Sequence, residues 1–370
     1  MIRPLLVCLA FALLAFVPLV SVAQEQPPAP DTPKVKEYAT YDALFDDFDK
    51  RRKVLITQFE RLQQKERVEP NELRKAEGEL MALDHEYAGA LRMYIDNHTG
   101  AKDLMPARFE NAVTLSRLED RLQDAVKAAD EFLKNHADSD LAPDARFVKA
   151  QTLFRMPGSE DVALVALEQF IEKHPERQDA NAARMMRVRT LLFLDRVADA
   201  KRALDMLIKS DKVKGDEDAR AFLQGQLDAL DWIGRDMPAF SIKDVDGKAL
   251  ASADWIDKPY LVFVWDTTSA PCLGELPFVQ EVHKRHGEKM PVLGISVNES
   301  KPAFEQWLGR NPDAIKFRSA WMDRVEEGTL IKKLSVSVIP FNVLVDAKGK
   351  VYRYDVRSDD LMRYAARLAK

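Results

Sequence analysis

The sequence predicts a protein of two parts, a helical solenoid followed by a smaller α/β sandwich, and hence an α + α/β fold class. Residues 39–232 carry apolar side chains at helical spacing, with prolines in the gaps between the predicted helices. After Trp232 the pattern changes to short apolar strands that alternate with helices, which is typical of a domain with parallel strands at its centre. A chain of 370 residues is long enough for both parts.

Residues 1–23 predict a secretory signal peptide. Arg3 gives a positive start, residues 5–20 are almost wholly apolar, and Ser21-Val22-Ala23 supplies small residues before a cleavage site. An uncleaved membrane anchor is the alternative, which is disfavoured because the apolar run is slightly short of a full span. We therefore expect a bacterial-type protein that is periplasmic or secreted and has no stable membrane span after cleavage.

The cysteine content limits the possible redox chemistry. The chain has two cysteines, and signal cleavage removes Cys8. The mature protein keeps only Cys272, which cannot form an internal disulfide. Between the cleavage site and the first predicted helix, residues 24–38 form a proline-rich linker.

An internal repeat with a constant period runs through the helical region. Each copy has an aromatic residue, an alanine four positions before it, a histidine four positions after it, and an alanine–arginine pair further on. These residues are Ala90, Tyr94, His98 and Ala107-Arg108 in the first copy, Ala128, Phe132, His136 and Ala145-Arg146 in the second, and Ala166, Phe170, His174 and Ala183-Arg184 in the third. The pattern predicts two antiparallel helices per copy, and it resembles a tetratricopeptide-type repeat of longer period.

The repeated residue types have a packing role in such a stack. Alanine lets helix backbones approach closely, and the aromatic side chain fills the space between one helix pair and the next. Stacked helix pairs would hold the three histidines about 10 Å apart, which is too far to share a metal ion. We therefore expect the histidines to stabilise the turns or the helix ends.

Composition and motifs exclude several classes of protein. The net charge of -5 gives no basic face of the kind that nucleic acids require. The sequence has no P-loop, no G-x-G-x-x-G after a strand and no His/Cys spacing typical of a metal site. We expect no nucleic acid, no cofactor and no metal, and a partner that is another exported protein or peptide.

A motif with one unusual residue follows the predicted core strand at residues 260–265. It runs Trp265-Asp-Thr267-Thr-Ser269-Ala-Pro271-Cys272-Leu-Gly-Glu275-Leu-Pro277, and Val338-Ile339-Pro340-Phe341 follows later in the chain. The two segments resemble the CxxC motif and the cis-proline loop of exported thioredoxin-like proteins of the TlpA/ResA type, in the redoxin (AhpC/TSA) superfamily. The resemblance covers residues 233–370 and implies a thioredoxin fold, in which Ser269 replaces the first cysteine.

This replacement removes the ordinary reaction of the family. The first cysteine lies at the start of a helix, where the helix dipole and free N–H groups stabilise a thiolate that attacks a disulfide. A serine hydroxyl is un-ionised at neutral pH, although it is a good helix N-cap. The candidate catalytic residues that the resemblance implies are therefore a degenerate set, Cys272, Ser269 and Glu275. We expect Cys272 to be covered and inert, and Glu275 to disfavour a thiolate further.

The resemblance also implies a groove in which an extended peptide can pair with the protein. We expect Trp265, Pro271, Ile339, Pro340 and Phe341 to line it, with Pro340 in a cis peptide bond. Phe341 replaces the small polar residue that is common at this place, and it would make the groove more apolar.

Three functions remain open. The first is a binding module without catalysis, which uses the groove and the solenoid to hold another exported protein. The second is a thioredoxin-like oxidoreductase that uses its single thiol in mixed disulfides. The third is a one-cysteine peroxidase, because Ser269 and Cys272 match the hydroxyl and the cysteine of the peroxiredoxin motif P-x-x-x-[TS]-x-x-C, although Trp265 replaces its proline.

Overall fold

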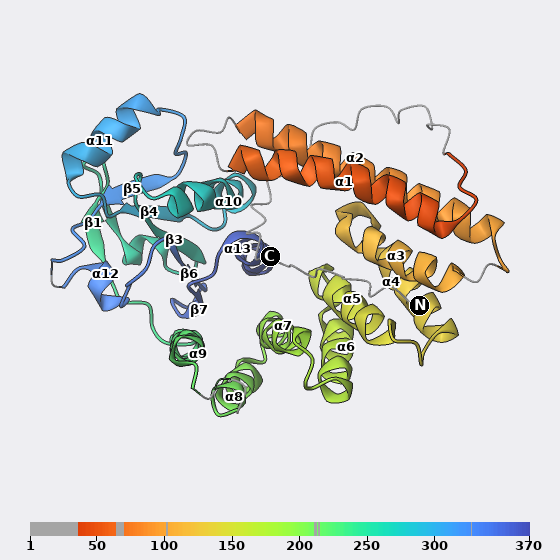
Figure 1. The fold of residues 1–370 in the computed structure, drawn as a ribbon. Helices are drawn as coiled ribbons and strands as arrows, with labels where there is room; N and C mark the ends of the chain where they lie inside the picture. Colours follow the sequence, from red (N-terminus) through yellow and green to blue (C-terminus); the bar gives the residue numbers. More distant parts are fainter. Residues whose placement is uncertain (1–35, 64–69, 101–102, 211–212, 214, 327) are drawn as a thin grey trace. The chain divides into compact units, whose positions relative to one another are not determined.

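The computed structural model describes residues 36–63, 70–100, 103–210, 213, 215–326 and 328–370. The predicted signal peptide and residues 24–35 of the predicted linker lie outside this part of the chain. The described residues form two compact units, a helical unit up to Ser210 and an α/β unit after it. Their secondary structure confirms the predicted α + α/β fold class (Figure 1).

In the helical unit each helix packs against the next one along the chain (Figure 1). The helices are α1 (Tyr41–Gln63), α2 (Pro70–Asn97), α3 (Leu104–Arg117), η1 (Glu119–Arg121), α4 (Leu122–Asn135), α5 (Ala142–Arg155), α6 (Glu160–Lys173), α7 (Asp179–Phe193) and α8 (Val197–Ile208). The three copies of the internal repeat fall on the pairs α2–α3, α4–α5 and α6–α7. Corresponding residues of the three copies therefore lie at corresponding places in the pairs.

Buried aromatic and alanine side chains fill the space between successive helix pairs. Phe132 of α4 contacts Phe109 of α3 with ring centroids 5.7 Å apart, and Phe170 of α6 contacts Phe147 of α5 at 5.2 Å. Fully buried alanines recur at one position of the second helix in each pair, namely Ala107, Ala145 and Ala183. Because these side chains are small, α3 can contact α5, and α5 can contact α7.

The α/β unit is built around a five-stranded sheet of order β5-β4-β3-β6-β7. Its elements are α9 (Glu217–Leu230), β1 (Ser241–Lys243), β2 (Ala249–Ala251), η3 (Ser252–Trp255), β3 (Tyr260–Trp265), α10 (Ala270–His286), β4 (Val292–Ser296), α11 (Lys301–Arg310), β5 (Arg318–Trp321), α12 (Leu330–Lys333), β6 (Phe341–Val345), β7 (Val351–Tyr354) and α13 (Ser358–Leu368). Strands β3, β4 and β5 are parallel, whereas β6 runs antiparallel to β3 and β7. The sheet is therefore mixed, with the predicted parallel pairing at its centre.

Strand β3 lies in the middle of the sheet and is buried along its whole length. Val262 and Val264 point into a core that also contains residues of the β1–β2 hairpin and α12. Phe263 points to the opposite face of the sheet, since successive side chains of a strand alternate, and it pairs with Asn342 of β6. Helix α10, which directly follows β3, packs against α13. This arrangement places the start of α10 at the carboxyl end of the central strand.

The segment after α9 is attached to the edge of the same sheet. The ring of Trp232 stacks on that of Tyr354 with centroids 5.1 Å apart, and the Gly234 N–H donates to the Val351 carbonyl at 2.8 Å. In the division of the chain into two compact units, α9 belongs to the α/β unit. The sequence pattern instead places residues 217–230 at the end of a helical repeat domain, 39–232, ahead of a domain at 233–370.

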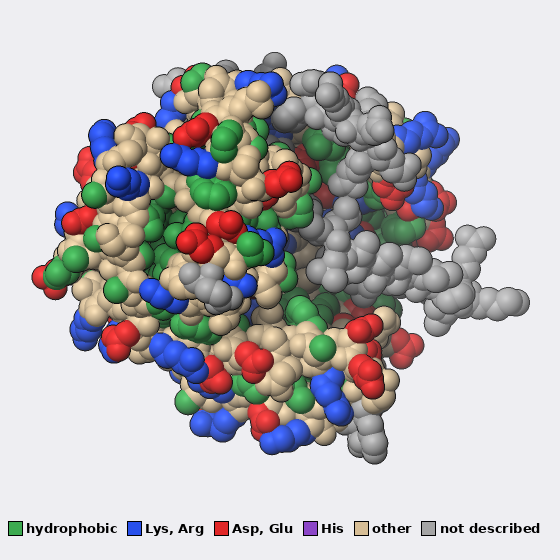
Figure 2. All heavy atoms as spheres, turned by 90° about the vertical axis from the view of Figure 1, so that its left-hand side faces the viewer, with side chains coloured by type: hydrophobic (Ala, Val, Ile, Leu, Met, Phe, Trp, Pro, Cys, Tyr) green, Lys and Arg blue, Asp and Glu red, His purple; other side chains and the backbone are tan. Residues whose placement is uncertain are grey.

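The surface seen in Figure 2 carries Lys and Arg side chains interspersed with Asp and Glu side chains, and apolar side chains between them. Across the described ranges, no helix combines the length and the apolar character that crossing a membrane would require.

Candidate functional site

The loop between β3 and α10 presents Ser269 at the start of the helix. Ser269 is the N-cap of α10 and has an extended backbone, with φ at -88° and ψ at 112°. Its carbonyl accepts the first helical hydrogen bond from the Leu273 N–H at 3.0 Å. Its hydroxyl does not bond the free N–H groups of the first turn. Ser269 therefore occupies the predicted N-cap position without the side-chain capping bond that serine often makes.

A buried asparagine that the sequence analysis did not identify holds this loop. The Asn298 side-chain amide donates to Thr267 Oγ1 at 2.6 Å and to Asp266 Oδ1 at 3.1 Å. Its oxygen accepts hydrogen bonds from the Ser296 hydroxyl at 2.7 Å and from the Thr267 N–H at 3.3 Å. Asn298 follows the end of β4, the strand next to β3. The sequence did contain a signal for Asn298, namely a polar residue that follows a buried parallel strand. Parallel strands have their carboxyl ends at the same edge of the sheet, so Asn298 could have been placed near the end of β3.

Cys272 lies in the first turn of α10 and is completely buried. It is a free thiol. Burial raises the pKa of the Cys272 thiol, whereas a hydrogen bond with the Ser269 hydroxyl and the positive charge of Arg357 act in the opposite direction. Because the thiolate is the reactive form, a buried thiol with a raised pKa is a poor nucleophile.

Glu275 is also buried, with 4% of its surface exposed. Its carboxylate accepts hydrogen bonds from the Asn342 side-chain amide at 2.9 Å and from the Ser358 hydroxyl at 3.1 Å. The Ser358 backbone N–H donates to both carboxylate oxygens, at 2.9 and 3.1 Å. Burial raises the pKa of Glu275, and the Ser358 hydrogen bonds and the charge of Arg357 oppose this shift. The carboxylate thus binds the first residue of α13.

Two aromatic residues that were expected to line the groove lie inside the protein. Trp265 is fully buried, and its ring makes edge contacts with Phe304 and Trp307 at centroid distances of 5.9 and 5.5 Å. Phe341 is buried in the core, with its ring against Tyr354 at 4.8 Å. The expectation that both line a surface groove is therefore wrong for their side chains. The direction of a side chain along a strand depends on the register of the sheet, which the motif alone does not give.

The other three expected groove residues range from exposed to buried. Pro271 is exposed, Ile339 is half-buried, and Pro340 is buried and joined to Ile339 by a cis peptide bond. Two further apolar side chains are exposed, Leu273 by 40% and Val338 by 60%. Leu273 directly follows Cys272, and Val338 directly precedes Ile339. These two residues therefore provide exposed apolar surface of the kind that was expected of Trp265 and Phe341.

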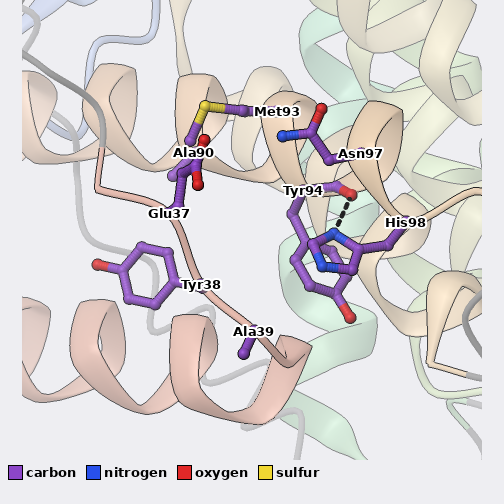
Figure 3. A pocket seen from close by; sticks show the side chains of 8 residues that line it. All are labelled: Glu37, Tyr38, Ala39, Ala90, Met93, Tyr94, Asn97 and His98. Carbon is purple, nitrogen blue, oxygen red and sulfur yellow. Dashed lines mark hydrogen bonds between the residues drawn. The ribbon is translucent and has the colours of Figure 1, made fainter.

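A separate pocket of about 400 Å³ lies in the helical unit (Figure 3). It is lined by Glu37, Tyr38, Ala39, Ala90, Met93, Tyr94, Asn97 and His98. The hydroxyls of Tyr38 and Tyr94 already donate to Asp47 and Asp103. In the described ranges of the chain, no group of three His, Cys, Asp or Glu side chains is arranged to hold a metal ion. The candidate site therefore remains the one at the start of α10.

The sequence of the α/β unit matches a known family. Residues 233–366 match the Redoxin family. The match covers most of the α/β unit, including Ser269 and Cys272, and this segment is called the Redoxin domain below. The helical unit lies outside the match.

The relatives of the Redoxin domain are thiol-disulfide oxidoreductases. The thiol-disulfide oxidoreductase ResA of Bacillus cereus is 28% identical over 121 residues, which are 32% of this chain and 66% of that protein. ResA of Bacillus subtilis is 25% identical over 121 residues, 32% of this chain and 65% of that protein. The chain thus spans slightly less than two thirds of the length of these relatives.

Solved structures are similar to about a third of this chain. The thioredoxin domain of a thiol-disulfide oxidoreductase from Bacteroides vulgatus gives a TM-score of 0.34 at 18% identity, with 37% of this chain and 98% of that chain covered. A thioredoxin-family thiol:disulfide interchange protein from Chlorobium tepidum TLS gives 0.32 at 26% identity, with 37% and 96% covered.

Proposed function

We propose that the Redoxin domain is a peptide-binding module that has lost dithiol turnover. The observation that carries this proposal is the pair of residues at the start of α10. Ser269 is the N-cap, where a thiol-disulfide oxidoreductase would need its attacking cysteine, and Cys272 has no exposed surface. A serine cannot form a mixed disulfide, and a buried thiol cannot reach a disulfide of a folded partner.

The surface around Ser269 supports binding of an extended apolar peptide. Pro271, Leu273 and Val338 are exposed, and Val338 directly precedes the Ile339–Pro340 segment with its cis peptide bond. The Arg324 guanidinium donates to the Ser337 carbonyl at 2.7 Å and so attaches the loop after β5 to the segment before Val338. A loop segment attached in this way would offer backbone groups to a bound peptide, while the exposed apolar side chains would select its residues.

The wider role follows from the other predicted parts of the chain. The predicted signal peptide supports export to the periplasm or the outside of a bacterial cell, where the partner would be another exported protein or peptide. The helical unit would offer a second contact surface for the same partner. Expression of a fusion to an enzyme that is active only after export would test the first step, since loss of residues 1–23 should abolish its activity.

A fluorescent library of extended peptides tests the binding function. Apolar peptides without cysteine are expected to bind the mature protein, and Val338→Glu should weaken this binding at least tenfold. Cys272→Ser should leave the binding unchanged, because the thiol is not part of the recognised surface. Failure to bind any peptide, together with rapid maleimide labelling of folded Cys272 at pH 7, would overturn the proposal in favour of mixed-disulfide chemistry.

One observation favours the one-cysteine peroxidase as a second candidate. Ser269 and Cys272 keep the hydroxyl and the cysteine of the peroxiredoxin motif, although the negative charge of Asp266 opposes a thiolate at Cys272 more strongly than the positive charge of Arg357 favours it. The test is whether the wild-type protein consumes hydrogen peroxide and whether Cys272→Ser and Arg357→Gln each abolish this activity. If so, peroxide reduction would be the main function. The burial of Cys272 predicts no such consumption.

A further inference from the structure

Three exposed apolar side chains belong to segments that meet at one edge of the central sheet. They are Leu273, Val325 and Val338, whose exposed fractions are 40%, 75% and 60%. Leu273 lies on α10, which follows β3, Val325 lies in the loop after β5, and Val338 lies in the loop before β6. The ends of β3, β4 and β5 and the start of β6 are level in the sheet register, so these segments leave the sheet at the same edge (Figure 1).

The start of α10 lies beside the start of β6. The Asn342 side-chain amide, on the second residue of β6, donates to the Glu275 carboxylate of α10 at 2.9 Å. Leu273 lies two residues before Glu275 on the same helix, and Val338 lies three residues before β6 begins. These two exposed side chains therefore come from adjoining segments.

The loop after β5 is attached to the segment that carries Val338. The Arg324 guanidinium donates to the Ser337 carbonyl at 2.7 Å. Val325 directly follows Arg324, and Val338 directly follows Ser337, so the two exposed valines lie in loops that this bond holds together. Leu273, Val325 and Val338 are called the apolar patch below.

Carboxylates are concentrated in the loops around the apolar patch. The three loops that follow β3, β4 and β5 carry Asp266, Glu299, Asp323 and Glu326, and Arg324 is the only lysine or arginine that the structure describes in them. The loop from α12 to β6 has no charged side chain. Across the described ranges, none of the four carboxylates forms an ion pair with a cation of the protein.

Hydrogen bonds connect these loops to one another. The Asn298 side-chain amide donates to Asp266 Oδ1 at 3.1 Å, and the Trp321 indole N–H donates to the Asn298 carbonyl at 2.8 Å. Asp323 Oδ1 accepts a backbone N–H of its own loop at 2.8 Å. Glu299 directly follows Asn298. The carboxylates therefore lie on connected loops at one edge of the sheet.

Few cations flank these loops. Lys301, at the start of α11, is paired with Glu305 at 3.4 Å, and Arg357, after β7, is paired with Asp355 at 2.9 Å. The two lysines of α12 are exposed on the helix that follows the β5 loop. Within the loops themselves, four carboxylates stand against one described cation, Arg324. An extended peptide on the apolar patch would therefore meet a surplus of negative charge.

We propose that the apolar patch binds an extended segment of an exported protein that carries lysine or arginine beside its apolar residues. The inference rests on the peptide binding proposed above and adds its selection by charge. Apolar side chains of the segment pack on Leu273, Val325 and Val338, and its cations lie beside the carboxylates of the surrounding loops. Because like charges across an interface are unfavourable, the same loops exclude acidic segments.

Fluorescence anisotropy with three labelled peptides tests the selection by charge on the full mature protein. Each peptide has Val-Val-Leu-Val at its centre, with two lysines, two glutamines or two glutamates on either side. The lysine peptide is expected to bind about tenfold more tightly than the glutamate peptide at low salt, and the difference should shrink at about 0.5 M NaCl. Equal affinities of the three peptides would overturn the selection by charge and leave peptide binding intact. If no peptide binds, the proposed function itself is wrong.

A double substitution of exposed carboxylates tests the residues that select. Glu299→Gln with Glu326→Gln should weaken binding of the lysine peptide about fivefold and leave that of the glutamine peptide unchanged. Asp257→Asn with Glu288→Gln is the matched control, because these carboxylates lie shortly before β3 and β4, at the opposite edge of the sheet. All four side chains are exposed, so both variants should fold. Equal weakening by the two double variants would show an effect of net charge alone and would contradict the proposal.

A second copy of the chain is the competing occupant of the apolar patch. Sedimentation of the mature protein at rising concentration is expected to show a monomer, and Val325→Ser should weaken binding of all three peptides alike because it removes apolar contact without changing charge. A dimer that Val325→Ser dissociates would assign the patch to a second copy. That result, or peptide binding that does not respond to Val325→Ser, would overturn the proposal.

Discussion

The Ser358 backbone N–H donates to both carboxylate oxygens of Glu275, at 2.9 and 3.1 Å. The two residues are 83 positions apart in the chain, and their contact joins the start of α10 to the first residue of α13. The first N–H groups of a helix have no partner within the helix, and a carboxylate there is also favoured by the helix dipole. Glu275 therefore has a structural role in the Redoxin domain, whether or not it ever exchanges a proton with Cys272.

Replacement of Glu275 by alanine is expected to destabilise the Redoxin domain by about 1–3 kcal/mol, because it leaves a buried donor on Asn342 and another on Ser358 without an acceptor. Urea unfolding at pH 7 measures the change. Glu288→Ala, at an exposed position just after the same helix, is the control and should change the stability by less than about 0.5 kcal/mol. Equal effects of the two substitutions would contradict the structural role of Glu275.

Restoring the missing cysteine tests whether the loop still has the geometry of a dithiol site. Ser269→Cys places a thiol at the N-cap of α10, where the helix dipole favours a thiolate. We expect this variant to form a disulfide with Cys272 and to reduce insulin at least tenfold faster than the wild type in the presence of dithiothreitol. Ser269→Ala should give no gain. A variant that stays reduced in oxidised glutathione would show that the loop has lost this geometry.

Ionisation of Cys272 should depend on pH in the direction set by its burial. Since burial raises the pKa of the thiol, alkylation of the folded protein by iodoacetamide is expected to rise only above about pH 8.5, the ordinary thiol value. The unfolded chain ionises first as the pH rises, so the contribution of the thiol to stability is lost above that pH. In urea, where the chain is unfolded, alkylation of Cys272 should rise with pH around the ordinary thiol pKa of about 8.5. A folded-state profile centred near pH 7 would show a reactive thiol.

Gly287→Ala is expected to destabilise the end of α10, although alanine is a better helix former than glycine. A Cβ atom at Gly287 would lie 2.5 Å from the His283 carbonyl oxygen and 2.6 Å from its Nδ1 atom, so the backbone would have to move, at a cost of about 1–3 kcal/mol. At Gly309 of α11, apart from its chain neighbours and the backbone of its own helix, no atom lies within 4 Å of the corresponding position. Gly309→Ala should therefore stabilise the protein by up to about 1 kcal/mol, and thermal unfolding compares the two variants.

Much of the architecture could be predicted from the sequence because it depends on local patterns. The run of apolar residues at 260–265 is the central strand β3, and the serine expected at the start of the following helix is its N-cap. The period of the internal repeat corresponds to successive helix pairs, since repeated side chains occupy repeated places. Strand β5 and helix α12 were not anticipated, because both are short, with 4 residues each, and have no clear periodicity.

The α + α/β class, the position of the candidate site and the absence of a second cysteine beside Cys272 follow from the order of the amino acids alone. The folded structure was needed to show that Trp265 and Phe341 point into the core, that Asn298 holds the site loop, and that Glu275 binds Asn342 and Ser358 from 67 and 83 residues away. The physical reason is that helix starts and strand runs are encoded within a few neighbouring residues. The direction of a buried side chain and the partner of a buried carboxylate depend on which distant segments the sheet and helices bring together.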